Sequence, residues 1–524
     1  MPTRYLALFC LISLLITIFG GGCACGPEYP PEVTKALDKA GQNRGQLVKV
    51  LEHYRAKGDS LEYLAAGWLI GNMPSHFYGT YVLQDTTGAE INFSIFDYPD
   101  YASLTQSFDS LEKRYGTLDF QAKGKIYDVE TISAELLIDH IDYAFRVWHE
   151  KPWARWVSFD EFCNYILPYR GSNEPLENWR PVFWGRYLTL QNGMTDSTDA
   201  TEAAVKINND IMSWFGFDPR YYYHPTDQGM TEMIKNRLGR CEDMTNLTIF
   251  AMRANGLAVT SDYTPAWADA GNNHAWNAIL IPGGKVVPFM GAEANPGSYG
   301  LANKFAKVYR KMFSEQKNNL AFQDKKQTEL PGWLAGKSYI DVTGDYQEVC
   351  DVTVPFDKPI PDSVDIAYLC VFNSGEWKAI HWGRIESGKV VFTDMGKEIA
   401  YLPALYLNKK FVPYGPPFIL GADCALRELR PDSGRTTSVQ VAATTGRVQA
   451  ASTDGIAKSF LTPGKEYELF YMADDWKSLG KAVAGDKPLV FENVPMGSLL
   501  WLVETNSDRE ERIFTYDNDR QIWW

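Results

Sequence analysis

Cys241 and His274 are the two side chains whose types and positions could together support nucleophilic catalysis. Cys241 lies in the stretch GRCEDMTNLTIFAMRANG, where a helix is predicted to begin, and His274 opens the strand-like run HAWNAILI. The unpaired N–H groups at a helix N-terminus carry partial positive charge, which favours both a thiolate and an oxyanion. A histidine beside such a thiol can take its proton and return it to a leaving group. The pair therefore predicts a thiol active site.

One helix and three strands are expected to position this pair. The helix carries an apolar stripe at helical spacing, made of Met244, Leu247, Ala251 and Ala254. Strand-like segments follow over residues 257–267, 274–281 and 285–289, and a helix followed by consecutive strands is typical of an α+β arrangement. In such an order the start of the helix and the start of the second strand can converge at one edge of a sheet.

The group that orients His274 is expected after the turn at residues 283–284. That region reads KVVPFMGAEANP, and its carboxylate is Glu293. Asn295 is the alternative, since an amide can also hold a histidine in place. On the strand itself, Trp276 shares the face of His274 and is expected to line the same cleft.

An ordered set of short motifs resembles the catalytic core of the transglutaminase-like superfamily. The set is G-x-C at the start of the helix, R-A-x-G at its end and H-A-W on the strand, and it covers residues 200 to 300. The resemblance implies a papain-like core in which Cys241 is the nucleophile and His274 the general base and acid. The Asp that orients the histidine in this superfamily aligns with Met290, so this sequence departs from the pattern. Either Glu293 or Asn295 orients His274 instead, or the core is inert.

The resemblance also implies an aromatic hydrogen-bond donor near the thiol. The candidates are Tyr221, Tyr222, Tyr223 and Trp214.

The segment FCNYILPYR…NEPLENWR is similar to one in large exported proteins with this core, and implies that Arg170 and Trp179 help to line the cleft. A structural ion pair of Arg170 with Glu174 or Glu177 is the favoured alternative. The predicted substrate-binding residues are Trp276, Arg170 and Trp214.

The N-terminus predicts export. Arg4 precedes an apolar run over residues 6–19, which is shorter than the roughly twenty residues that span a bilayer but suits an export signal. Gly22 before Cys23 resembles a bacterial lipoprotein signal, in which Cys23 becomes the lipidated N-terminus. Cys25 is a second candidate, and an ordinary cleaved signal is the alternative. We expect a chain anchored by lipid to a bacterial membrane, facing the periplasm or the cell surface.

The length of 524 residues predicts several domains. The expected division is a signal peptide (1–22), a tether (23–32), a helical region (33–190), the transglutaminase-like core (191–335), a β-sandwich-like module (336–435) and a jelly-roll-like module (436–524). The fold class is α+β. The polar stretch near residues 300–335 is expected to be helical and to connect the core to the first β module.

Five cysteines follow the anchor region, namely Cys163, Cys241, Cys350, Cys370 and Cys424. An odd number in an exported protein leaves at least one thiol free or paired outside the chain. Cys350 and Cys370 lie in strand-like segments and are a candidate disulfide, whereas Cys163 is expected to be a buried core thiol.

Composition and motifs exclude several classes of function. The net charge of −14 argues against a nucleic-acid partner. The seven histidines form no zinc-ligand spacing with Cys or carboxylates, and no cofactor is expected.

The sequence therefore predicts a cell-envelope thiol hydrolase that cleaves an amide in a peptide, protein or glycopeptide through a Cys241 acyl-enzyme. The alternatives are an acyltransferase, or an inert lipoprotein whose β modules bind a glycan or protein. The oligomeric state stays open.

Overall fold

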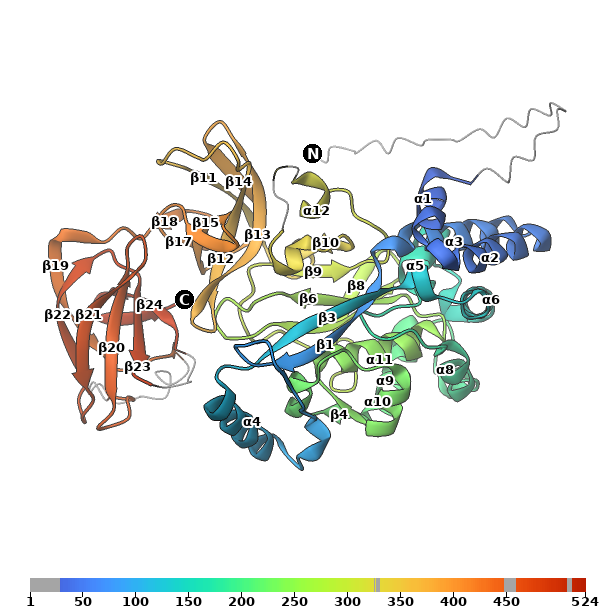
Figure 1. Ribbon diagram of the computed structural model, residues 1–524, viewed down its shortest axis with the longest axis horizontal. Helices are drawn as coiled ribbons and strands as arrows, with labels where there is room; N and C mark the ends of the chain where they lie inside the picture. The colour runs from blue at the N-terminus through green and yellow to red at the C-terminus, as the bar shows by residue number, and fades with distance from the viewer. Residues whose placement is uncertain (1–28, 325, 327–329, 447–458, 507–510) are drawn as a thin grey trace.

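The computed structural model describes residues 29–324, 326, 330–446, 459–506 and 511–524, and it has the predicted α+β class (Figure 1). Helices of the N-terminal region pack on one side of a mixed central core, and the C-terminal β-sheets lie on the other side (Figure 1). Cys23, the predicted lipidation site, lies outside the described residues. In the described ranges, no helix combines the length and the apolar character that crossing a bilayer requires.

The N-terminal region is a set of helices with a three-stranded antiparallel sheet. Its helices are α1 (Pro31–Lys39), α2 (Arg44–Lys57), α3 (Ser60–Asn72), α4 (Tyr101–Tyr115), α5 (Asp128–Thr131), α6 (Ala134–Glu150), α7 (Phe159–Glu161) and α8 (Arg180–Arg186), and its strands are β1 (Phe77–Gln84), β2 (Glu90–Ile91) and β3 (Asp119–Tyr127). The sheet order is β2-β1-β3. Cys163 is 2% exposed, as predicted, and packs in the apolar core of this region.

The central core is one antiparallel sheet with helices packed on it. The sheet order is β10-β9-β6-β7-β8. The strands are β6 (Val259–Thr264), β7 (His274–Ile281), β8 (Lys285–Phe289), β9 (Tyr309–Lys311) and β10 (Tyr339–Asp341), and the helices are α9 (Ala200–Met212), α10 (Met230–Asn236) and α11 (Cys241–Arg253). A short parallel pair, β4 (Gly216–Phe217) with β5 (Leu238–Gly239), precedes α11. The predicted helix and its three following strands are confirmed.

The helix predicted near residues 300–335 is wrong over most of its length. Strand β9 runs through that stretch and pairs with both β6 and β10, and only the single turn α12 (Leu320–Gln323) is α-helical there among the described residues. Arg310 donates to both carboxylate oxygens of Asp262 at 2.8 Å, and both side chains are buried. This ion pair between neighbouring strands favours strand pairing over the local helical preference.

The C-terminal part is built almost entirely of antiparallel strands. The first group is β11 (Val349–Pro355), β12 (Ile366–Asn373), β13 (Glu376–Glu386), β14 (Lys389–Gly396), β15 (Ile399–Leu407), β16 (Lys410–Pro413), β17 (Phe418–Leu420) and β18 (Leu426–Glu428). The second group is β19 (Asp432–Val441), β20 (Glu466–Met472), β21 (Trp476–Val483), β22 (Leu489–Met496), β23 (Leu500–Glu504), β24 (Ile513–Asp517) and β25 (Arg520–Trp523). The predicted hairpin turn at Ser387-Gly388 joins β13 to β14, with φ values of 50° and 76° that suit a two-residue hairpin loop.

Cys350 forms a disulfide with Cys424, across a Cα–Cα distance of 5.8 Å. The candidate pair of Cys350 and Cys370 is therefore wrong, and Cys370 is a buried free thiol. The reason is the alternation of side chains along β12. Leu369 and Val371 pack in the same apolar cluster as Cys350, whereas Cys370 points to the other face and packs in a different cluster.

Candidate active site

The helix α11 is buried along its whole length, which determines where its first residue lies. Every residue of α11 except Glu242 is buried. Phe250 stacks on Trp179 of the N-terminal region, with ring centroids 5.0 Å apart. At the far end, the Arg253 guanidinium donates to the backbone carbonyls of Tyr165, Pro168, Arg170 and Val259. These contacts hold the helix on all sides.

The turn before α11 is equally restricted. A Cβ atom at Gly239 would lie 2.5 Å from the Cβ of Asp243, so this position accepts only glycine without rearrangement. The Asp243 carboxylate accepts hydrogen bonds from the backbone N–H groups of Arg240 and Gln228, both at 3.0 Å. Asp243 thus caps the helix and joins it to the preceding loop. The G-x-C motif needs a glycine at residue 239 because the capping side chain of Asp243 occupies the space of a Cβ atom there.

Cys241 begins α11 and lines a cavity of about 1010 Å³. It is 8% exposed. Burial raises the pKa of the thiol to about 12, and the Glu242 carboxylate adds to this increase. Hydrogen bonds to the sulfur from the backbone N–H groups of Ala275 and Glu242 lower the pKa in part. Cys241 is therefore a protonated thiol at neutral pH, and its sulfur lies beside the residue that follows His274.

His274 opens β7, and its ring lies between two tryptophan rings. The ring centroids of Trp267 and Trp276 are each 5.8 Å from that of His274. The Nε2 atom is 2.8 Å from the hydroxyl oxygen of Tyr299. Burial lowers the pKa of His274, although the Glu242 charge opposes this effect, so the ring is neutral at pH 7. The site therefore holds a neutral thiol and a neutral imidazole.

A tyrosine hydroxyl, rather than a carboxylate, is the hydrogen-bond partner of His274. Glu293 is exposed, and no hydrogen bond joins it to His274 in the described structure. Burial raises the pKa of Tyr299, and the nearby Glu293 carboxylate adds to this increase. Met290 is 1% exposed and belongs to the core. The sequence did not indicate Tyr299, which lies in a loop without regular spacing.

The amide of Asn295 is committed to another contact. Its Nδ2 donates to the Asn209 side chain at 2.7 Å, and its Oδ1 accepts from Asn208 at 3.0 Å. Asn208 in turn accepts a hydrogen bond from the backbone of Ala292 at 2.8 Å. Asn295 therefore ties the loop after β8 to α9.

Tyr222 is the aromatic candidate that lies beside the thiol. It lines the cavity, and burial together with the Cys241 charge raises the pKa of its hydroxyl to about 12. Tyr221 and Tyr223 instead contact Phe96 and Phe108 of the N-terminal region. The indole Nε1 of the fourth candidate, Trp214, lies 3.4 Å from the Asp210 carboxylate, and Trp214 does not line this cavity.

The structure places the other two predicted substrate contacts in buried positions. Trp276 is fully buried and donates to the Tyr346 hydroxyl at 2.9 Å, behind His274. Arg170 lines the cavity but is 4% exposed, and its guanidinium pairs with Asp128 at 2.5 Å. The ion pair of Arg170 is therefore structural, as the favoured alternative has it, but its carboxylate is that of Asp128 and not of Glu174 or Glu177. Arg170 also donates to the backbone carbonyl of Glu174.

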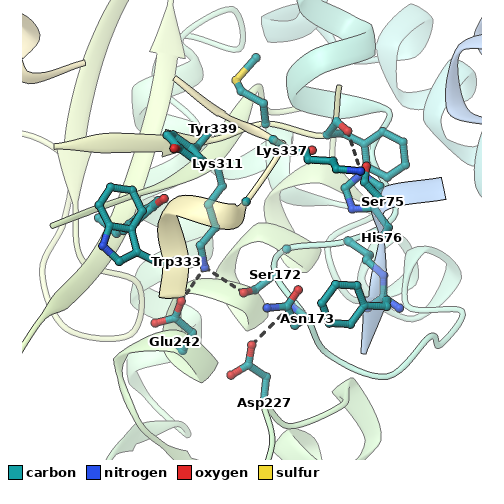
Figure 2. Close-up of a pocket in the computed structure, with 18 of the residues that line it drawn as sticks. Ser75, His76, Ser172, Asn173, Asp227, Glu242, Lys311, Trp333, Lys337 and Tyr339 are labelled. Carbon is teal, nitrogen blue, oxygen red and sulfur yellow. Dashed lines mark hydrogen bonds and ion pairs between the residues drawn. The ribbon is translucent and has the colours of Figure 1, made fainter. Parts of the chain in front are cut away.

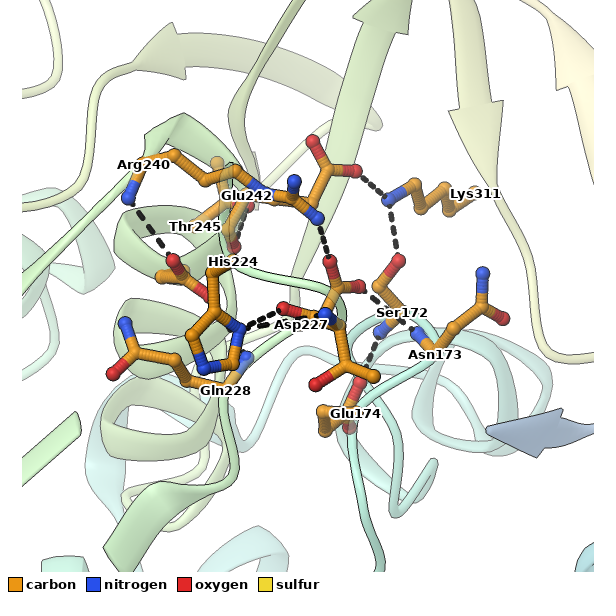
Figure 3. A network of polar contacts seen from close by, with 12 residues as sticks. Ser172, Asn173, Glu174, His224, Asp227, Gln228, Arg240, Glu242, Thr245 and Lys311 are labelled. Carbon is orange, nitrogen blue, oxygen red and sulfur yellow. Dashed lines mark hydrogen bonds and ion pairs between the residues drawn. The ribbon is translucent and has the colours of Figure 1, made fainter. Parts of the chain in front are cut away.

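A polar network forms the floor of the cavity beside Cys241 (Figures 2 and 3). The Lys311 ammonium donates to Ser172 at 2.8 Å and to Glu242 at 2.5 Å. The Arg240 guanidinium donates to Asp227 at 2.6 Å. Burial would lower the pKa of Lys311, but Glu242 and Asp227 outweigh it and raise the pKa. Lys311 was missed because its strand was predicted to be helical.

The loop between β6 and β7, which leads into His274, is held by the C-terminal strands. The Asn373 amide donates to the carbonyls of Trp267, Ala270 and Asn272 at 2.8–3.0 Å. The Arg512 guanidinium donates to the carbonyl of Ala268 in the same loop. Since Trp267 stacks on His274, the C-terminal β-sheets contribute to the position of the histidine.

The sequence was also compared with known protein families. Residues 189–290 match the family model described as the Transglutaminase-like superfamily. No curated protein matches the chain. The matched segment runs from the residues before α9 to Met290, so it contains Cys241 and His274 but ends before Tyr299. The segment from 189 to 290 is therefore a transglutaminase-like domain, of a superfamily whose fold is that of cysteine proteases.

Proposed function

We propose that this protein is a cell-envelope thiol hydrolase that cleaves an amide bond in a peptide or glycopeptide through an acyl-enzyme at Cys241. The observation that supports it most is the arrangement around β7. The backbone of Ala275, the residue after His274, lowers the pKa of the Cys241 thiol in part, and the Nε2 of His274 is 2.8 Å from the Tyr299 hydroxyl. Cys241 lines a substrate-sized cavity, and so does Asn273, the residue before His274.

In the first half of the reaction, His274 acts as general base. If Nε2–H donates to the Tyr299 oxygen, Nδ1 carries a lone pair and can take the proton of the Cys241 thiol. The sulfur then attacks the amide carbon, and the backbone N–H groups at the start of α11 stabilise the oxyanion together with the Tyr222 hydroxyl. His274 returns its proton to the leaving nitrogen, the C–N bond breaks, and a thioester remains on Cys241.

In the second half, water resolves the thioester. His274 takes a proton from the water as its oxygen attacks the thioester carbon, the C–S bond breaks, and the proton returns to the sulfur. The products are a carboxylic acid and the free thiol. An amine in place of water would make the protein an acyltransferase. We choose hydrolysis because water needs no second binding site.

The cell-envelope location rests on the N-terminal sequence, where a short apolar run over residues 6–19 precedes Cys23. Lipidation of Cys23 would anchor the chain to a bacterial membrane. We expect Cys23→Ala to move the protein from the membrane fraction to the soluble fraction of the envelope. Fractionation of expressing cells measures this, and a variant that stays in the membrane pellet contradicts the assignment.

Replacing Cys241 by Ala removes the nucleophile. We expect kcat/KM for hydrolysis of a fluorogenic peptide-amide library to fall by about 10³-fold or more. The matched control is Cys370→Ala, which removes another buried thiol that does not line this cavity and should retain activity in proportion to its folded fraction. Activity of Cys241→Ala within twofold of wild type, or a wild type that releases no product from any peptide, would refute the enzyme proposal.

Replacing Tyr299 by Phe removes only the hydroxyl that contacts His274. We expect kcat to fall by about 10-fold to 100-fold because the imidazole loses its orienting partner, with KM changed by less than about twofold. Tyr127→Phe is the control, since Tyr127 lines the cavity but forms no hydrogen bond to His274. Unchanged kcat in Tyr299→Phe would show that the hydroxyl does not position the histidine.

A further inference from the structure

The cavity that Cys241 lines carries more cationic than anionic side chains. The cations that line it are Lys39, Lys125, Arg170, Arg240, Arg253, Lys311 and Lys337, and the carboxylates are Glu130, Asp227 and Glu242. The chain as a whole has a net charge of −14. The overall composition therefore does not account for the positive charge of this cavity, and the partners of each cation must be considered in turn.

Four of the cations have partners within the protein. Near Cys241, Arg240 pairs with Asp227 and Lys311 pairs with Glu242. Arg170 pairs with the buried Asp128. Arg253 donates to four backbone carbonyls that hold α11 in place. These groups balance one another or serve the fold, so they do not account for the excess.

The three remaining lysines come from separate elements. Lys39 ends α1, Lys125 lies on β3, and Lys337 lies just before β10. Within the described part of the chain none of them forms an ion pair. Lys125 and Lys337 have cation–π contacts, with Nζ 4.4 Å from the Phe77 ring centroid and 5.7 Å from that of Phe322. Burial raises the pKa of Glu315, but Lys317, its ion-pair partner, outweighs burial and lowers the pKa with a smaller contribution from Lys337. The charges of the three lysines are available to a ligand.

Lys337 lies apart from the two ion-paired carboxylates of the cavity. Figure 2 shows Lys337 on the side of Ser75 and His76, with Glu242 and Asp227 on the opposite side. His76 donates to the Phe313 carbonyl at 2.7 Å and stacks on the Phe313 ring, and burial lowers the pKa of His76, so it adds no charge at neutral pH. Glu130 is the one carboxylate that lines the cavity besides Asp227 and Glu242.

We propose that the lysines Lys39, Lys125 and Lys337 bind a carboxylate of the substrate, and that the protein acts on acidic peptides or glycopeptides. This inference rests on the proposed function, because the same cavity presents Cys241. A concave site lined by one sign of charge focuses its field and concentrates ligands of opposite charge. A cavity of about 1010 Å³ has room for several residues on either side of the reacting amide.

Binding to the Cys241→Ala protein tests this proposal without turnover. The probes are fluorescein-labelled pentapeptide amides that differ only in a central Glu, Gln or Lys, and the Gln peptide with a free C-terminal carboxylate. Fluorescence anisotropy at low and high salt gives the Kd of each. We compare Lys39→Gln/Lys125→Gln/Lys337→Gln with the charge-matched control Lys49→Gln/Lys113→Gln/Lys410→Gln, whose exposed lysines do not line the cavity.

We expect a carboxylate-bearing peptide to bind at least about fivefold more tightly than the neutral Gln amide at low salt, and less so at high salt. The preference should fall below about twofold in the cavity variant and persist in the control. A gain with the Glu side chain or with the free C-terminus identifies which carboxylate is used. Equal binding of all peptides, binding of none, or a preference that survives in the cavity variant would overturn the proposal. The Cys241→Ala activity assay tests turnover separately.

Discussion

The burial of α11 on every side is the constraint on which the rest of the site depends. The helix packs against β6 and β7, against α8 and α9, and through Arg253 against carbonyls of the N-terminal region. A helix held in this way cannot shift to accommodate a substrate, so Cys241 has a defined place at the cavity. The same burial removes water from the sulfur, which raises the pKa of the thiol.

The second half of the site is positioned by parts of the chain that are distant in sequence. His274 starts β7, its ring is stacked by Trp267, and the loop of Trp267 is held by Asn373 and Arg512 from the C-terminal sheets. The helical N-terminal region supplies the cavity with the Arg170–Asp128 ion pair and with two of the three lysines that form no ion pair in the described structure. The transglutaminase-like domain is thus completed by its neighbours on both sides.

The sequence predicted the local parts of this arrangement well. Residues close together in the sequence determine these parts, through the spacing of apolar side chains and the residue types that favour turns. They are the apolar stripe of α11, the three strands after it and the hairpin at Ser387-Gly388. The failures all involve contacts between distant segments. Strand β9 forms because it pairs with β6 and β10. Cys370 does not pair with Cys350 because side chains alternate along β12, and Cys350 bonds to Cys424 instead. Tyr299 reaches His274 from an irregular loop.

The central claim is that Cys241 is a buried neutral thiol activated by His274, and its alkylation rate as a function of pH tests this most directly. Iodoacetamide labelling of Cys241, followed by mass spectrometry of the tryptic peptides, separates it from the buried thiols Cys163 and Cys370. Since the pKa of Cys241 is raised to about 12, the thiolate fraction and the labelling rate should rise about tenfold per pH unit from pH 7 to pH 10. A rate that is already at its plateau by pH 7 would contradict the account, because it would require a preformed thiolate.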